Sequence, residues 1–316
     1  MYLISNIKEE SPDFNLDSPK SYEWLYFDVH FEDYYLVIIF FNGNPFSPSY
    51  FMNNYTREYG LNISLFQNDK CKSFTFYNTQ NRKELFSKLI FEDNKISINL
   101  NELDKKGKSI NIKLDFKHGR PILNNEVIKF GNDNDKWIIN SLKYEVEGNI
   151  NFDNQNHQIK TLGYHDHNYG DDISSLYQNI PKWYWGYMIQ EKIAVNYFYI
   201  SAQDNKALIL IDDGLTVKNY FAEIKLLKFK ISRVGMRYAS KLNFHNNDFD
   251  LNVENIYNQD FKKFGFSGVV YSRSASAFRF NFKGEKYEGE GTSEFSDLKR
   301  MNNILFRRMM KYGIDK

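Results

Sequence analysis

The chain has 316 residues, with 41 Lys and Arg against 40 Asp and Glu, one cysteine and 17% aromatic residues. A hydrophobic fraction of 42% is enough for a packed core, which excludes disorder of the whole chain. A net charge of +1 lacks the basic excess of a dedicated nucleic-acid binder. Cys71 alone cannot form a disulfide scaffold, a four-cysteine zinc site or an iron–sulfur cluster.

No segment has the length of a membrane-spanning helix, because the best apolar run, residues 36–41, is only as long as a strand. The first ten residues lack the basic and apolar regions of a signal peptide. We therefore expect a reducing compartment and predict a cytoplasmic protein.

Short segments of alternating polar and apolar residues recur along the chain, and turn residues such as Asp153-Asn154 separate them. They lie at residues 23–31, 95–100, 109–116, 143–151, 194–201 and 277–282. Because aromatic and β-branched residues favour strands, this pattern predicts an all-β chain of antiparallel barrels or sandwiches.

Two segments have helical spacing instead. Residues 81–90 predict one short helix, and residues 296–312 predict a longer C-terminal one with Leu298, Met301, Leu305 and Met309 along one side. The longer helix carries basic residues, namely Lys299, Arg300, Arg307, Arg308 and Lys311. Such a helix packs on a barrel with its charges in water, or it lies on an anionic membrane surface. The second alternative would give transient membrane contact and a peripheral location.

The chain divides most naturally near its middle. Residues 171–181 are polar and end in Pro181, and aromatic motifs begin both halves. Two β units of this size fit ordinary domain lengths. We predict an N-terminal β domain over residues 1–175 and a C-terminal β domain with a terminal amphipathic helix over residues 176–316.

The densest group of chemically active side chains is residues 162–172, LGYHDHNYGDD. If the segment is extended, alternation places Tyr164, Asp166 and Asn168 on one face and His165, His167 and Tyr169 on the other. An apolar barrel would keep the Asp166 carboxyl protonated and make it a general acid. The alternative is an aspartate that caps a turn at a strand end, with solvated histidines.

The His-X-His pair also raises the question of a metal site. His165 and His167 would point the same way from a strand, but a third ligand would have to come from a distant residue, and no HExxH motif is present. The alternative is that both rings orient a neighbouring strand by hydrogen bonds. We predict no metal.

Four segments resemble, in order, the motifs of the carotenoid hydratase family: residues 22–28, 163–170, 183–186 and 289–295. This lipocalin-like two-domain family is related to tocopherol cyclase and to lipocalin-like Diels–Alderases. The resemblance spans about residues 20–296. It implies two tandem lipocalin-like antiparallel β-barrels that enclose an apolar cavity, with the C-terminal helix appended and no cofactor.

The resemblance also implies site residues. The motif aspartate, the expected acid, is Asp166, and the motif tyrosine is Tyr164. An upstream His-X-Trp element corresponds to the region of Trp137, but Asp135 stands where the family has histidine. Tyr169 and Leu25 likewise replace family tryptophans. Whether the replacement by Asp135 removes carotenoid-hydrating activity stays open.

The chemistry of hydration or cyclisation is the protonation of an alkene carbon and the stabilisation of the resulting cation. Aromatic faces can stabilise that cation by roughly 0.5–2 kcal/mol each. We expect the substrate to contact Trp24, Tyr26, Asp28, His30, Trp137, His165, Asn168, Trp183 and Trp185. The alternative for each aromatic residue is that it fills the barrel core.

The sequence therefore predicts a cofactor-free enzyme, a lyase or an isomerase, that acts on a hydrophobic unsaturated small molecule such as an isoprenoid, polyene or polyketide. Two alternatives remain, a pericyclase that folds a polyene without proton transfer and a non-catalytic lipophile-binding protein. The sequence gives no oligomeric state.

Overall fold

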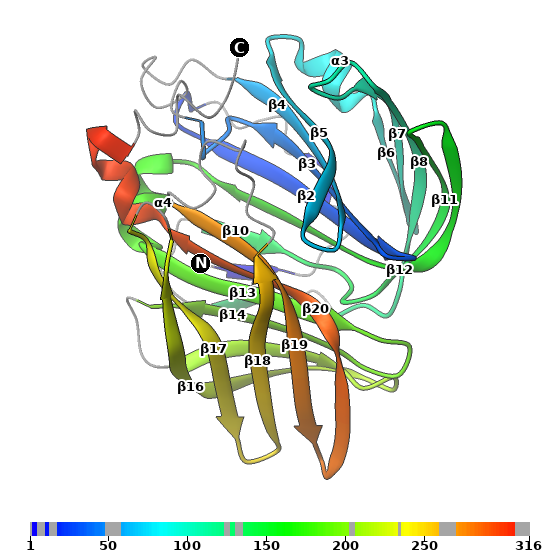
Figure 1. Ribbon diagram of the computed structural model, residues 1–316. Helices are drawn as coiled ribbons and strands as arrows, with labels where there is room; N and C mark the ends of the chain where they lie inside the picture. Colours follow the sequence, from blue (N-terminus) through cyan, green and yellow to red (C-terminus); the bar gives the residue numbers. More distant parts are fainter. Residues whose placement is uncertain are drawn as a thin grey trace. The chain divides into compact units, whose positions relative to one another are not determined.

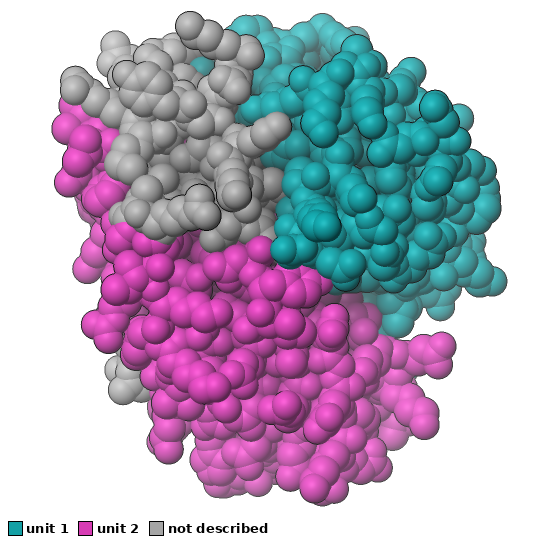
Figure 2. Space-filling view, viewed as in Figure 1, with its two compact units in different colours: residues 1–45, 50–129, 133–173 teal, residues 46–49, 130–132, 174–316 magenta. Residues whose placement is uncertain are grey.

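The computed structural model describes residues 2–4, 10–12, 18–47, 58–122, 127–129, 135–201, 206–232, 235–258 and 270–306 (Figure 1). The chain divides into two compact units, coloured separately in Figure 2. Unit 1 comprises residues 1–45, 50–129 and 133–173. Unit 2 comprises residues 46–49, 130–132 and 174–316. The main division falls between Ile173 and Ser174. The sequence analysis predicted it between residues 175 and 176.

Unit 1 is one sheet of twelve strands with the order β5-β4-β3-β2-β12-β11-β8-β7-β6, and β10, β1 and β9 continue from β12. The strands are β1 (Tyr2–Ile4), β2 (Tyr22–Phe31), β3 (Tyr34–Asn42), β4 (Tyr59–Gln67), β5 (Lys70–Thr79), β6 (Leu89–Glu92), β7 (Lys95–Leu103), β8 (Ser109–His118), β9 (Val127–Lys129), β10 (Asp135–Ile138), β11 (Tyr144–Phe152) and β12 (Gln155–Gly170).

Tight hairpins fix the register of this sheet. Asp153 and Asn154 both have positive φ, 49° and 64°, and link Phe152 directly to its partner Gln155. Two central residues of positive φ make the turn that matches the twist of antiparallel strands, and Asn and Asp tolerate it best. The β2–β3 hairpin is equally short, because Phe31 pairs with Tyr34.

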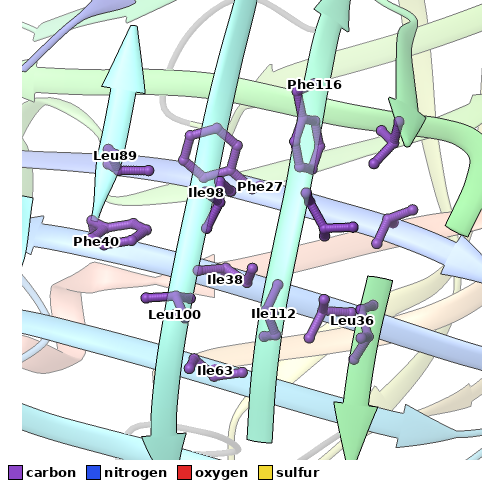
Figure 3. Close-up of a cluster of buried hydrophobic side chains, with 14 of the residues drawn as sticks. Phe27, Leu36, Ile38, Phe40, Ile63, Leu89, Ile98, Leu100, Ile112 and Phe116 are labelled. Atoms are coloured by element: carbon purple, nitrogen blue, oxygen red, sulfur yellow. The ribbon is translucent and has the colours of Figure 1, made fainter. Parts of the chain in front are cut away.

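The sheet of unit 1 curls so that two of its parts face each other across a hydrophobic core. Figure 3 shows side chains from β2, β3 and β4 meeting side chains from β7 and β8. The central residues, such as Phe27, Ile63 and Phe116, have no exposed surface. These aliphatic and aromatic side chains fill the curl, so its interior is a packed core.

Unit 2 is a closed barrel in which β13 to β20 follow one another and β20 pairs back with β13 (Figure 1). The strands are β13 (Lys182–Ile189), β14 (Ala194–Ile200), β15 (Lys206–Asp212), β16 (Val217–Ile231), β17 (Arg237–Asn246), β18 (Phe249–Asn258), β19 (Tyr271–Phe282) and β20 (Glu285–Asp297).

Side chains also fill the barrel of unit 2. Its core cluster includes Tyr184, Tyr197 and Phe278, all buried. A void of about 10 Å³ lined by Tyr184, Tyr197 and Tyr238 has room for about one water molecule. The all-β prediction is confirmed, with one closed barrel and one curled open sheet in place of two closed barrels. Bulky side chains pack the core cluster of each unit.

The first predicted helix is shorter than expected, and in the second, residues 304–306 are helical. The segment at residues 81–90 contains α3 (Arg82–Phe86), capped by the Asn81 side chain, and then turns into β6. A further helix, α4, spans Ile173–Asn179. Over residues 296–312 the helix prediction was wrong at the start, where strand β20 continues to Asp297 and a 3₁₀ helix, η1, spans Leu298–Asn302.

Arg307, Arg308, Met309 and Lys311 lie outside the described residues. None of the helices in the described parts of the chain is long and apolar enough to cross a membrane.

Candidate active site

One face of the unit 1 sheet carries the polar and aromatic residues that the sequence singled out. Directly paired residues of antiparallel strands point to the same side, and β12 pairs Tyr164 with Asp28, Asp166 with Tyr26 and Asn168 with Trp24. We call this surface the Tyr–Asp face and define it by residues from β2, β3, β10 and β12, namely Trp24, Tyr26, Asp28, His30, Tyr35, Trp137, Tyr164, Asp166 and Asn168.

Asp166 lies near the centre of this face and is only 5% exposed. Its Oδ2 accepts the indole N–H of Trp137 and the hydroxyl of Tyr164, both at 2.8 Å. Its Oδ1 accepts the side-chain amide of Asn168 at 2.9 Å. The alternation predicted for this segment is therefore confirmed, because both Tyr164 and Asn168 reach Asp166 on one side of β12.

This set of donors favours a charged carboxylate. An indole N–H and an amide N–H can only donate, and each oxygen of Asp166 already accepts at least one of them. Hydrogen bonds to the charged form oppose the cost of burial. Burial instead raises the pKa of the Tyr164 hydroxyl well above its usual value, with the Asp166 charge adding to the effect. Tyr164 is therefore a neutral donor.

A second buried carboxyl, Asp28, lies on the same face and is 1% exposed. Its Oδ2 lies 2.6 Å from the Tyr26 hydroxyl and 2.9 Å from the Tyr35 hydroxyl. The two hydroxyls are themselves 2.9 Å apart. Three oxygens thus form a closed triangle in which every side has hydrogen-bond length.

The two carboxyls belong to matching Tyr-X-Asp units on paired antiparallel strands. Tyr26 stands opposite Asp166 and bonds to Asp28, whereas Tyr164 stands opposite Asp28 and bonds to Asp166. The two tyrosine rings meet edge to face, with centroids 6.1 Å apart. Asp28 and Asp166 are diagonal neighbours, a relation that separates side chains by about 7–8 Å.

The histidines of β12 lie on the opposite side, against the hydrophobic core. His165 is fully buried, stacks on Phe27 at 4.1 Å and bonds through Nδ1 to the carbonyl of Tyr26 at 2.8 Å. His167 Nε2 lies 2.8 Å from Glu23 Oε1. Both partners are on β2, which confirms that the rings orient the neighbouring strand. The placement of His165 differs from the expectation that it contacts substrate, because alternation turns it into the core.

The described residues contain no cluster of three or more His, Cys, Asp or Glu side chains arranged to bind a metal. Burial lowers the pKa of His165 to about 4, so this ring is neutral at ordinary pH.

Asp135, which replaces the family histidine, lies at the beginning of β10 and is 1% exposed. The Tyr22 hydroxyl donates to its Oδ1, and its buried Oδ2 has no hydrogen-bond partner. Gly170, paired with Asp135, makes room for this contact, since a β-carbon there would lie 2.6 Å from the Tyr22 hydroxyl. Burial raises the pKa of Asp135 to about 6.

Asp135→Asn should change how stability depends on pH. A raised folded-state pKa means that the folded chain binds more protons than the unfolded chain between about pH 4 and 6, so stability falls as pH rises through that window. This fall should be absent in the variant. Its free energy of unfolding relative to that of the wild type should therefore increase by about 2–3 kcal/mol from pH 4 to pH 7. Urea unfolding across this range measures the difference. The control is Asp115→Asn, a change at an aspartate whose side chain is 41% exposed. Parallel profiles would contradict the assignment.

The other predicted residues are distributed over both units. Trp24 is half-buried and stacks on Tyr22. His30 has accessible surface and stacks on Tyr35 at 4.2 Å, and burial lowers the pKa of its ring to about 4. Trp183 and Trp185 are buried in β13 of unit 2, on the outer side of its barrel, since the intervening Tyr184 belongs to the core.

Tyr35 is a member of the Tyr–Asp face that the sequence analysis did not identify. It pairs with His30 across the short β2–β3 hairpin, which brings its hydroxyl to Asp28. The sequence does carry a signal for this hairpin, because the acidic pair Glu32-Asp33 separates two alternating segments. Glu10 was also missed, because only the folded chain brings it to His118 and Tyr144, 2.6 Å from each.

A groove of about 540 Å³ lies elsewhere in unit 1, beside α3. Its lining includes Arg82, Phe86, Leu89 and Phe91 and no residue of the Tyr–Asp face. We place the candidate site on the Tyr–Asp face because the lining of the groove contains no carboxyl group.

Trp137→Phe should weaken any function of Asp166 without unfolding the chain. The change keeps an aromatic ring but removes one donor from a buried carboxylate, an interaction that contributes about 1.5–3 kcal/mol. We expect kcat/KM to fall roughly 10–100-fold at unchanged circular dichroism. Tyr144→Phe is the matched control, because it removes a donor from the buried carboxylate of Glu10 in the core. Equal losses in both variants would contradict a special role for Asp166.

No protein-family model matches the chain. It is similar to a curated protein named hydroxyneurosporene dehydrogenase from Chlorobaculum tepidum, with 25% identity over 265 residues that cover 69% of this chain and 68% of the relative.

Two solved structures share the fold. Kievitone hydratase from Nectria haematococca aligns with a TM-score of 0.62 and 10% identity, over 94% of each chain. CghA, solved with Sch210972, aligns with a TM-score of 0.54 and 10% identity, over 90% of each chain. These likenesses confirm the resemblance to the carotenoid hydratase and lipocalin-like two-domain family and its mostly-β architecture.

Proposed function

We propose that the protein is an enzyme that hydrates or cyclises a hydrophobic unsaturated small molecule by proton transfer, without a cofactor. The observation that carries this proposal is a pair of buried carboxyls on one aromatic face, Asp28 and Asp166, each held by tyrosine hydroxyls. Two buried carboxyls on one face are typical of acid–base sites.

The reaction itself needs no change of oxidation state. Addition of a proton to an alkene makes a carbocation, and either water or a second double bond then attacks it. The rings of Trp24, Tyr26 and Trp137 supply faces or edges for such a cation. The names of the similar proteins support a hydrophobic substrate, since one is named for a hydroxylated carotenoid and another is a hydratase.

A pericyclase is the second candidate function, because the resemblance to lipocalin-like Diels–Alderases and the likeness of the fold to CghA favour it. Such an enzyme folds a polyene into a reactive conformer and transfers no proton. The two candidates differ in one property, the need for a carboxyl group.

Comparison of metabolites between cells with and without the gene tests the proposal and narrows the substrate. We expect cells that lack the gene to accumulate a lipophilic compound that differs from the missing product by one water for a hydratase, or by nothing in composition for a cyclase. Identical metabolite profiles, together with stoichiometric binding of a lipophile by the purified protein, would indicate a carrier instead.

A further inference from the structure

The two carboxyls of the Tyr–Asp face differ in the partners that surround them. Asp166 is surrounded by groups that include two pure donors, the Trp137 indole and the Asn168 amide. Asp28 bonds to the hydroxyls of Tyr26 and Tyr35, which both donate and accept. Environments that differ in this way assign different protonation states to two neighbouring acids.

Counting protons in the Asp28 triangle gives its protonation state. Each hydrogen bond between two oxygens contains one proton, and the triangle has three such contacts, of 2.6, 2.9 and 2.9 Å. The hydroxyls of Tyr26 and Tyr35 bring two protons. If Asp28 were ionised, only these two protons would be available for three contacts. Lone pairs would then face each other across the third contact. With a protonated Asp28, each oxygen donates once and accepts once, and the triangle is complete.

We infer that Asp28 is the protonated carboxylic acid that delivers the proton, and that Asp166 is the carboxylate that stabilises the cation and removes the second proton. This inference rests on the proposed function for its chemical role, although the protonation states stand on the hydrogen bonds alone. It assigns separate tasks to two diagonal neighbours on one face, which lie about 7–8 Å apart.

The O–H bond of Asp28 breaks and its proton forms a C–H bond with one alkene carbon, leaving a cation on the other carbon. In hydration, water forms the C–O bond and gives its proton to Asp166. In cyclisation, a second double bond forms the C–C bond and a neighbouring carbon gives its proton to Asp166. Asp166 then releases that proton to solvent and Asp28 takes up a proton from solvent, which restores the starting state.

Infrared spectroscopy of the unliganded protein tests the protonation states without any substrate. A protonated carboxyl gives a C=O stretching band that shifts in D₂O, and at about pH 8 Asp135, with its pKa of about 6, is ionised and does not contribute. We expect this band in the wild type and in Asp166→Asn, and its loss in Asp28→Asn. A band that persists in Asp28→Asn would overturn the inference.

A second variant covers the case in which Asp28→Asn does not fold. Tyr35→Phe removes one hydroxyl from the triangle, so the band should move to higher wavenumber because the acid loses a partner. An unmoved band would overturn the inference.

Turnover separates this inference from the proposed function. Asp28→Asn should lower kcat by about 10²–10⁴-fold, whereas Asp104→Asn, a buried aspartate in a turn away from the face, should not. If Asp28→Asn keeps near-normal turnover while Asp166→Asn is inactive, the assignment of the acid is wrong and the proposed function stands. If wild-type product forms without any proton from solvent, the proposed function is wrong, whatever the infrared result.

Discussion

Asp166→Asn is expected to abolish turnover while the protein remains folded and still binds its lipophilic substrate. The amide has nearly the same shape as the carboxylate but carries no charge and cannot accept a proton. The loss of an acid–base group lowers the rate by about 10²–10⁴-fold. Steady-state kinetics and substrate binding by fluorescence quenching measure the two effects separately.

Asp104→Asn is the matched control for this change. Asp104 is 7% exposed and accepts the backbone N–H groups of Lys106 and Lys108, so the substitution also places an amide where a buried carboxylate was. It should leave turnover near the wild-type value. A pericyclase would behave differently, because Asp166→Asn would then keep substantial activity and changes of shape at Trp24 would cost more.

Phe27→Ala is expected to lower the free energy of unfolding by about 3–5 kcal/mol, the usual loss for a phenylalanine in a packed core. Phe27 is fully buried and its ring lies 5.3 Å from that of Phe116 and 4.1 Å from that of His165. The removal of the ring therefore empties the centre of the curl in unit 1. Urea unfolding followed by circular dichroism measures the loss.

Phe221→Ala is the control for general effects of losing a ring, since Phe221 is 49% exposed on β16. Surface changes of this kind alter stability by about 0.5 kcal/mol or less. If Phe27→Ala left stability near the wild-type value and weakened lipophile binding instead, the interior of unit 1 would be a ligand cavity and our placement of the site on the Tyr–Asp face would be wrong.

The sequence predicted the class of fold and the two sides of β12 because both depend on local periodicity. Alternating runs and turn residues such as Asp153 and Asn154 mark strands and hairpins without knowledge of the partner strands. The pattern could not say which side of β12 faces the core. Residues 163–170 are buried on both sides, so the usual contrast between an apolar inner and a polar outer side is absent.

The residues that complete the site depend on pairing across the sheet. Tyr35 joins Asp28 only through the register of β2 and β3, and Glu10 reaches the β8–β11 region from a distant part of the chain. The C-terminal helix was predicted from its apolar spacing to begin at Ser296, but pairing of β20 with β13 extends the strand through Asp297. Ladder hydrogen bonds to neighbouring strands thus override the local helical preference at these two residues.

The proposed function depends on the transfer of a proton from the Tyr–Asp face to a carbon of the substrate. The most direct measurement is the deuterium content of product formed by the wild-type enzyme in D₂O. We predict carbon-bound deuterium that survives return of the product to ordinary water, and no such product from Asp166→Asn. Product that forms at the normal rate with no carbon-bound deuterium would contradict the claim.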